Sequence, residues 1–362
     1  MINLKNYFSN TFAGTCNNST LYFPEPTERV GRIFYKISVA GEFNYKFFFS
    51  NNAFSTFDNG SASYANLKGN KYTVNYAKVG YCTTEYTEFD GLGLKDLTFN
   101  GQKSKEVLDG EEYWSDSVLL NVEKDGYLVF EWSVTGDKMP YTPDKIIPAQ
   151  VLTNGVFELN NEFPQPNMVA CDRPIDKRII FLGDSITQGL GTEFNAYKFW
   201  SARIGETLVP KHGVWNIGLG FGRAQDAASD KVWLSCAKVA DFVSVCYGIN
   251  DILQGRTVEQ IKNDIKTIIT KLIESGVKVG VFTVPPFDFE DYREDMRVEI
   301  NEFIFSEIAP MVEYVFDFAK ALANPEKPNF TVHGDHPDNE GCRIAAEEFL
   351  RQFDIDKILI KG

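Results

Sequence analysis

Residues 178–189 read RIIFLGDSITQG, a short and mostly apolar run that ends in glycine, aspartate and serine. Its length and apolar content predict a buried strand that ends at Gly183. Similar runs alternate with amphipathic stretches over the rest of the chain. We predict further strands at 214–219, 240–247, 278–284 and 314–318, and helices at 196–209, 224–237, 257–276, 293–308 and 340–353. This alternation predicts an α/β fold, a parallel sheet with helices on both faces.

The first part of the chain has a different pattern. Tyr72, Val74 and Tyr76 alternate with polar residues, which is typical of half-buried strands. Two further alternating runs, 118–122 and 128–134, flank Asp125-Gly126, and this combination predicts a β-hairpin. Of the 16 tyrosines, 12 lie before residue 166, and tyrosine is enriched in strands. We therefore predict an all-β sandwich, jelly-roll-like, over residues 1–150.

Length and proline spacing predict how the chain is divided. A chain of 362 residues is long enough for two domains. Prolines recur between residues 140 and 174 in a stretch without regular periodicity that is too apolar for a free linker. We therefore predict an accessory β-domain at 1–150, a packed connector at 151–177 and a catalytic α/β domain at 178–362.

Charge and composition exclude several kinds of partner. The formal net charge is −14, and an acidic surface repels phosphate backbones and anionic lipids. Nucleic acid and membrane are therefore poor partners, although acidity that serves solubility alone would look the same. No apolar stretch approaches the ~18 residues of a bilayer span. The N-terminus lacks the basic start and apolar run of a signal peptide, so we expect a cytoplasmic protein.

Cysteines and histidines give little support for a metal or an organic cofactor. The six cysteines contain no CxxC pair, and we expect them to be reduced and mostly buried. The chain has only three histidines. His333 and His336 could form a metal pair, but a third ligand is missing nearby in the sequence. His212 precedes the second predicted strand and is expected to be structural. We predict neither metal nor cofactor.

Polar motifs follow three of the predicted strands and precede the last helix. Ser185 follows the first strand, at a corner where its hydroxyl can leave the sheet near a helix N-terminus. Taken alone, Asp184 or Ser185 would equally serve as a helix cap. The glycine run 218–222 follows the second strand and lets the backbone approach a ligand. It lacks the spacing of a phosphate-binding fingerprint.

Asn250 follows the third strand, where its amide could donate to an oxyanion, or could simply close an Asx turn. His336 stands before Pro337 at the start of the last helix and could act as a general base. Because the carboxyl ends of parallel strands share one edge of a sheet, these motifs converge. Together they supply a nucleophile, oxyanion donors and a base, the groups that acyl transfer requires.

In this order, the motifs resemble those of the SGNH hydrolases, also called GDSL-type esterases. Gly183-Asp184-Ser185 matches the first block, the glycine run the second, Gly248-Ile249-Asn250-Asp251 the third and His336-Pro337 the last. The resemblance covers about residues 178–355. It implies that Ser185 attacks an ester carbonyl, that His336 takes its proton, and that the oxyanion lies among the Ser185 N–H, a glycine N–H and Asn250.

The chain departs from the family pattern at two places. The family glycine usually stands five residues beyond the asparagine of the second block, and here that residue is Phe221. We predict Gly222 as the backbone donor, with Gly220 as the alternative. The family acid usually stands three residues before the histidine, and here that residue is His333. We therefore predict a Ser–His dyad whose histidine is oriented by a backbone carbonyl; Asp335 is the alternative.

A β-rich domain ahead of an SGNH domain is similar in architecture to carbohydrate esterase family 2. That resemblance implies a serine esterase that removes O-acetyl groups from acetylated oligosaccharides or polysaccharides. A lipase or thioesterase for small acyl groups is the alternative within the family. A carbohydrate-binding protein with a degenerate catalytic half is the alternative from another class. The sequence determines neither the sugar nor the hydroxyl, neither the oligomeric state nor a role of the N-terminal domain in binding.

Overall fold

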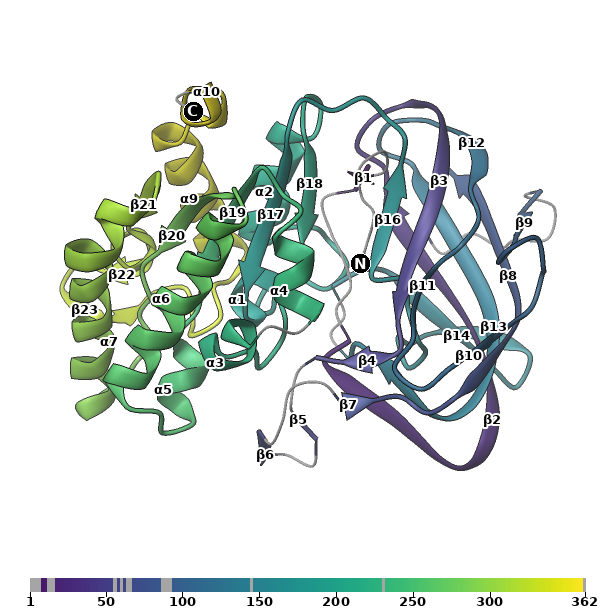
Figure 1. Cartoon of the computed structure of the whole chain (residues 1–362), viewed down its shortest axis with the longest axis horizontal. Helices are drawn as coiled ribbons and strands as arrows, with labels where there is room; N and C mark the ends of the chain where they lie inside the picture. Colours follow the sequence, from purple (N-terminus) through teal and green to yellow (C-terminus); the bar gives the residue numbers. More distant parts are fainter. Residues whose placement is uncertain are drawn as a thin grey trace.

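The computed structural model describes residues 8–11, 17–54, 57–58, 61–62, 67–85, 93–143, 146–229 and 232–360. Up to Cys171 these residues form two antiparallel sheets (Figure 1). The first sheet is built on β3 (Gly41–Ser50), which pairs with β11 (Glu112–Trp114), β12 (Val118–Val122) and β16 (Met168–Cys171), and β16 pairs with β1 (Phe8–Ser9). The second sheet contains β2 (Ser19–Lys36), β8 (Tyr72–Cys82), β9 (Lys95–Leu97), β10 (Lys105–Val107), β13 (Tyr127–Tyr141), β14 (Ala149–Thr153) and β15 (Val156–Leu159).

Aromatic side chains fill the space between these two sheets. Phe47 and Phe49 of β3 face Phe130 and Trp132 of β13, with ring centroids 5.1 Å apart for Phe47–Phe130 and 4.9 Å for Phe49–Trp132. The rings are buried because alternate residues of each strand point to the same face. The predicted β-sandwich is confirmed, whereas its jelly-roll connectivity stays a prediction.

The second half contains the predicted parallel sheet, in the order β18 (Gly213–Asn216), β17 (Arg178–Gly183), β19 (Phe242–Cys246), β20 (Lys278–Phe282), β21 (Tyr314–Phe316). All four pairings in this sheet are parallel. The order places β17 in the interior, between β18 and β19. The chain reverses direction across the sheet there, and such a switch point opens a crevice at the carboxyl edge.

Helices lie on both faces of the parallel sheet (Figure 1). On one face, α6 contacts both α3 and α7. On the other face, α9 contacts both α2 and α8. The helices are α1 (Ser185–Gln188), α2 (Trp200–Leu208), α3 (Ala224–Ala228), α4 (Val232–Ala237), α5 (Ile249–Leu253), α6 (Val258–Glu274), α7 (Tyr292–Phe303), the π-helix η1 (Ile304–Ile308), the 3₁₀-helix η2 (Ala309–Met311), α8 (Phe318–Leu322), α9 (Asn339–Gln352) and α10 (Ile355–Ile360). Short strand pairs complete the fold: β4 (Asn52–Ala53) with β7 (Leu67–Lys68), β5 (Phe57–Asp58) with β6 (Ser61–Ala62), and β22 (Ala323–Asn324) with β23 (Lys327–Thr331).

The hairpin predicted around Asp125-Gly126 is wrong. β12 pairs with β3 in the first sheet, whereas β13 pairs with β2 and β8 in the second. Asp125 does adopt the left-handed conformation, with φ of 66°, and the turn is fixed by hydrogen bonds to Ile37. A corner between two sheets needs the same backbone conformation as a hairpin tip. The alternating pattern identifies the buried face of each strand but not its partner.

Two other elements differ from the prediction. The single helix predicted at 224–237 is two helices, α3 and α4, because Ser229 is extended and its hydroxyl donates to the Asp226 carbonyl at 2.7 Å. The segment predicted as a connector, 151–177, contributes β15, β16 and most of β14 to the two antiparallel sheets. The predicted domain boundaries themselves stay a prediction.

One hydrophobic core extends through both halves of the chain. The Trp215 indole N–H, in β18, donates to the Asn167 carbonyl at 3.2 Å. The Tyr197 hydroxyl donates to the Phe34 carbonyl and accepts from the Lys36 N–H, each at 3.1 Å. A Cβ on Gly213 would lie 2.3 Å from the Phe8 ring, so this glycine lets β1 approach the parallel sheet. The sandwich and the α/β half therefore pack as one body.

The described cysteines and His212 are buried. The described cysteines form no disulfide with one another, and they are Cys82, Cys171, Cys236, Cys246 and Cys342; Cys16 lies outside the described residues. His212 is 2% exposed, and its carbonyl accepts from buried Arg173 at 2.9 Å. Burial lowers the pKa of the His212 imidazole. This environment fits the structural role expected for it.

Candidate active site

Ser185 is the first residue of α1, directly beyond the end of β17. Gly183 permits this tight corner, since a Cβ there would lie 2.1 Å from the Thr187 hydroxyl oxygen and 2.7 Å from the Cys246 carbonyl oxygen. The side chain of Asp184 caps the helix by accepting from the Ile186 N–H at 3.0 Å. The capping role belongs to Asp184, and the Ser185 hydroxyl is left for another partner.

That partner is His336. The Ser185 Oγ lies 2.9 Å from the His336 Nε2, although the two residues are 151 positions apart. His336 belongs to the loop between β23 and α9 and is 25% exposed at its side chain. The Phe287 ring contacts the imidazole edge to face, with centroids 5.9 Å apart. A Cβ on Gly191 would lie 2.7 Å from the His336 Cβ, so this glycine lets the histidine settle close to the chain that follows α1.

The other imidazole nitrogen, His336 Nδ1, makes no hydrogen bond among the described residues. Within the described part of the chain, no backbone carbonyl accepts a hydrogen bond from it. Its nearest acceptor is the Asp335 Oδ1 at 3.5 Å, and this oxygen already accepts from the His336 backbone N–H at 2.7 Å. The expected carbonyl is thus not found among these residues, because the loop directs the Asp335 side chain, not a peptide oxygen, toward the ring.

His333 occupies the position of the family acid but points to another partner. Its Nδ1 lies 3.3 Å from the Asp338 Oδ1, and Asp338 is the N-cap of α9. A Cβ on Gly341 would lie 2.7 Å from the His333 Cβ, so the histidine packs on the first turn of that helix. Across the described ranges, no three or more His, Cys, Asp or Glu side chains are grouped to hold a metal ion.

Asn250 lies in the first turn of α5, just after β19. Gly248 precedes this helix with φ of 137°, and a Cβ there would lie 2.8 Å from Val284. The Asn250 Nδ2 donates to the Gly222 carbonyl at 3.0 Å. Among the described residues this is the one hydrogen bond of a group that carries two N–H donors, so a second N–H remains for a ligand.

The glycine run forms a tight loop between β18 and α3. The Gly222 N–H donates to the Leu219 carbonyl at 2.9 Å, so it would have to leave this turn to serve an oxyanion. Phe221, at the family glycine position, has φ of 61°, the left-handed conformation that glycine favours. The backbone shape expected of a glycine is therefore kept. The assignment of Gly222 or Gly220 as the donor stays a prediction.

Two buried carboxyl groups lie beneath the site. Burial raises the pKa of Asp184 to about 7, and the nearby Asp251 carboxylate raises it too. Burial also raises the pKa of Asp251 to about 7, although the Ala224 N–H and the Arg256 charge oppose this rise. Asp251 is 0% exposed and its Oδ2 accepts from the Ala224 N–H at 2.8 Å.

Sequence reasoning missed the residues that support the site. Asp251 belongs to a sequence motif that indicates no role for it. No local sequence signal indicates a role for Arg223, Arg256, Phe287 or Gly191. Their partners lie far away in the chain: Arg223 bonds to Gln254 and Phe287 contacts His336. Only the folded chain brings them together.

The parallel sheet and the Ser–His contact lie in the part of the chain that matches a known family. Residues 181–344 match the model of the GDSL-like Lipase/Acylhydrolase family. The C-terminal half of the chain therefore carries a domain of this family, whose members hydrolyse ester bonds, and the expected SGNH resemblance is confirmed. No curated protein matches the chain.

Solved structures similar to part of this chain include the following three. A putative lipolytic protein of the G-D-S-L family from Desulfitobacterium hafniense DCB-2 has 21% identity and TM-score 0.42, covering 49% of this chain and 100% of its own. A member of the same lipolytic family from Veillonella parvula DSM 2008 has 22% identity and TM-score 0.40, with 49% and 97% covered. An Axe2 mutant, an acetyl-xylooligosaccharide esterase from Geobacillus Stearmophilus, has 19% identity and TM-score 0.38, with 50% and 96% covered.

The described helices include none that is both long and apolar enough to cross a membrane.

Proposed function

We propose that this protein is a serine esterase that removes O-acetyl groups from acetylated carbohydrates, with Ser185 as nucleophile and His336 as general base. The observation that carries the proposal is the 2.9 Å contact between Ser185 Oγ and His336 Nε2, at the carboxyl edge of a GDSL-family domain. A hydroxyl in hydrogen-bond reach of a neutral imidazole can lose its proton as it attacks.

The reaction proceeds through an acyl-enzyme. The Ser185 oxygen attacks the acetyl carbonyl carbon while His336 Nε2 takes the hydroxyl proton. The resulting oxyanion is stabilised by the Ser185 N–H and the second amide N–H of Asn250, and its charge develops as the serine attacks. The carbon–oxygen bond to the sugar then breaks, and the sugar oxygen takes the proton from His336. Water, deprotonated by His336, attacks the acetyl-serine. The bond between the Ser185 oxygen and the acetyl carbon then breaks, His336 returns the proton to the Ser185 oxygen, and acetate leaves.

The rim of the site supports a polar, uncharged substrate. Asp335, Asp338 and Glu193 surround the histidine loop, and each side chain is more than half exposed. Glu193 is tied to this loop by its N–H, which donates to Asn339 Oδ1 at 3.0 Å. Carboxylates accept hydrogen bonds from sugar hydroxyls, whereas they repel the phosphates of a coenzyme A thioester. Glu193 is paired with Lys198 at 2.6 Å, so the carboxylates of Asp335 and Asp338 carry this preference for a carbohydrate ester over the thioesterase alternative.

The test measures acetate released from acetylated xylan and mannan oligosaccharides by the full chain, beside Ser185→Ala. We expect release by the wild type and a loss of about 10⁴-fold or more in the variant, because the variant lacks the attacking oxygen. The same proteins are assayed with p-nitrophenyl esters of acetate and longer acids, and with acetyl-coenzyme A.

Each alternative has its own result. Faster hydrolysis of long-chain esters than of acetate indicates a lipase, and preference for the coenzyme A ester indicates a thioesterase. Binding of the oligosaccharides without any release indicates a binding protein with a degenerate catalytic half. Any of these results contradicts the proposed deacetylation.

A further inference from the structure

The glycine-rich loop (residues 217–223) and the Asn250 turn meet at one hydrogen bond, from Asn250 Nδ2 to the Gly222 carbonyl. An amide group is planar, so the direction of one N–H fixes the direction of the other. The position of the Gly222 carbonyl therefore determines where the second Asn250 N–H points. A residue that fixes the peptide after Gly222 therefore also fixes the direction of the second Asn250 N–H, the proposed oxyanion donor.

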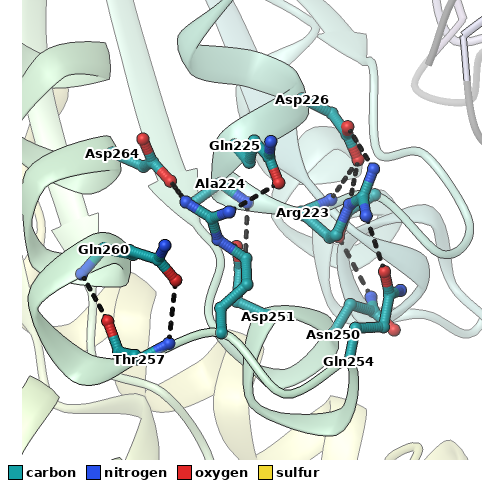
Figure 2. Close-up of polar contacts among 12 residues, drawn as sticks. Arg223, Ala224, Gln225, Asp226, Asn250, Asp251, Gln254, Thr257, Gln260 and Asp264 are labelled. Carbon is teal, nitrogen blue, oxygen red and sulfur yellow. Dashed lines mark hydrogen bonds and ion pairs between the residues drawn. The ribbon is translucent and has the colours of Figure 1, made fainter. Parts of the chain in front are cut away.

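Arg223, the next residue, joins that peptide to the end of α5. Its Nε and Nη2 donate to the two carboxylate oxygens of Asp226 at 2.9 and 2.8 Å. Its Nη1 donates to the Gln254 Oε1 at 2.8 Å, so the planar guanidinium group links α3 to the end of α5 (Figure 2). The Arg223 and Asp226 side chains are only 11% and 9% exposed, and a bidentate pair in such a position fixes geometry as well as charge.

Arg256 and Asp251 form a second connection, at the next peptide along the chain, between Arg223 and Ala224. Asp251 accepts from the Ala224 N–H, and its Oδ1 lies 3.4 Å from the Arg256 Nε (Figure 2). Arg256 also donates to the Gln225 Oε1 at 2.7 Å and to Asp264 of α6. The helix that follows begins with a capping box between Thr257 and Gln260, which fixes the chain just after Arg256.

We propose that Arg223 and Arg256 are positioning residues for the oxyanion site, acting through the Gly222 carbonyl and the Asn250 amide. We call their two connections the arginine clamp. The inference rests on the proposed function. Among the described residues, the side-chain contacts of both arginines are with groups other than Ser185 and His336, so the clamp acts at a distance from the reacting atoms. Since the oxyanion forms only after the serine attacks and is absent from the bound substrate, a loosened clamp lowers kcat and leaves KM nearly unchanged.

The main test replaces Arg223 in two ways, Arg223→Lys and Arg223→Gln, and measures kcat and KM for p-nitrophenyl acetate. We expect kcat to fall about 10- to 100-fold in both, because a displacement of about 1 Å at a reacting group can cost about 10²-fold. KM should change less than about threefold. Lysine retains the charge but not the fork, so a Lys variant with wild-type kcat contradicts the proposal.

A double variant separates positioning from general damage. If Arg223 acts through Asn250, Arg223→Gln adds no further loss in an Asn250→Ala background. If the losses of kcat from the two single variants multiply in the double variant, the arginine acts on stability or at another place. That result would overturn the inference. Arg351→Gln is the matched control: Arg351 makes the same bidentate i, i+3 pair, with Glu348 at the end of α9, and should keep wild-type kcat. Thermal unfolding of every variant verifies folding.

The two proposals fail in different ways. Esterase activity that survives Ser185→Ala contradicts the proposed function, whatever the arginine variants do. Activity that is abolished by Ser185→Ala but keeps its kcat in Arg223→Gln contradicts the clamp alone. A rise in KM with unchanged kcat in the Arg223 variants would also contradict the clamp, because it would place the arginine against the substrate in the ground state.

Discussion

Ser185 and His336 are 2.9 Å apart, but the chain around each of them is built differently. The serine side, meaning Ser185 with Asn250 and the glycine-rich loop, is buried and joined by many hydrogen bonds. Ser185 and Asn250 are each 8% exposed, with fully buried Asp251 behind them. The histidine side, meaning residues 331–338, is more exposed, and the His336 ring is held by packing against Phe287 and Gly191.

This difference follows from distance to the sheet. Ser185 and Asn250 come within four residues of a strand end, so the ladders of the parallel sheet fix their backbones. His336 lies in a loop beyond the sheet, and the loop is anchored by separate bonds. The Thr331 N–H donates to Asp288 Oδ1, and the Asp338 N–H donates to the His333 carbonyl, each at 2.9 Å. The comparison implies that single polar groups matter more on the serine side than on the histidine side.

Asn250→Ala gives the largest effect and tests the serine side. We expect kcat to fall about 10²- to 10³-fold with a small change in KM, since one donor to the oxyanion is lost. Steady-state kinetics with p-nitrophenyl acetate measure it. A loss below tenfold would show that Asn250 closes an Asx turn after β19 and is not an oxyanion donor. Asn250→Asp serves as a second variant, because it keeps the size of the side chain but removes the N–H donors.

Asp335→Ala gives a smaller effect and tests the histidine side. Its carboxylate lies 3.5 Å from His336 Nδ1 without a hydrogen bond to the ring, so we expect less than a tenfold loss of kcat/KM. A loss as deep as that of Ser185→Ala would show that Asp335 is the third member of a triad, and would remove the contrast between the two sides.

Phe287→Leu is the companion variant on the same side. It keeps an apolar side chain but loses the edge-to-face ring contact, so we expect a several-fold loss of kcat that equals or exceeds the effect of Asp335→Ala. The same assay compares the two variants directly. If Asp335→Ala costs far more than Phe287→Leu, packing is not what holds the imidazole.

The smallest effect concerns stability. Burial raises the pKa of Asp184, so the folded state binds this proton more tightly than the unfolded chain does. Its contribution to stability is full below pH ~4 and is lost as pH rises through about 7. Asp184→Asn keeps an oxygen to cap α1 but cannot ionise. We expect its free energy of unfolding, measured with urea, to improve relative to wild type between pH 4.5 and 8. A constant difference would contradict this.

The sequence predicts the serine side better than its supports. Ser185, Asn250 and His336 are predictable because parallel topology brings strand ends to one edge. Arg223 and Gln254 could not be paired from sequence, because 31 residues separate them. The hydrogen-bond partner of the Gly222 N–H depends on the direction of one peptide in a turn. The distance from Asp335 to the His336 ring depends on a side-chain rotamer. The partner of β12 likewise depends on which sheet the chain enters after a corner.

The shared core and the hydrogen bonds of Trp215 and Tyr197 have a consequence for how substrate enters. Halves of a chain that meet through small polar surfaces swing about a hinge, whereas a large apolar contact prevents it. Here the sandwich and the hydrolase domain share one apolar core, so they do not open and close like jaws. The two halves are therefore expected to keep one relative orientation when a substrate reaches Ser185.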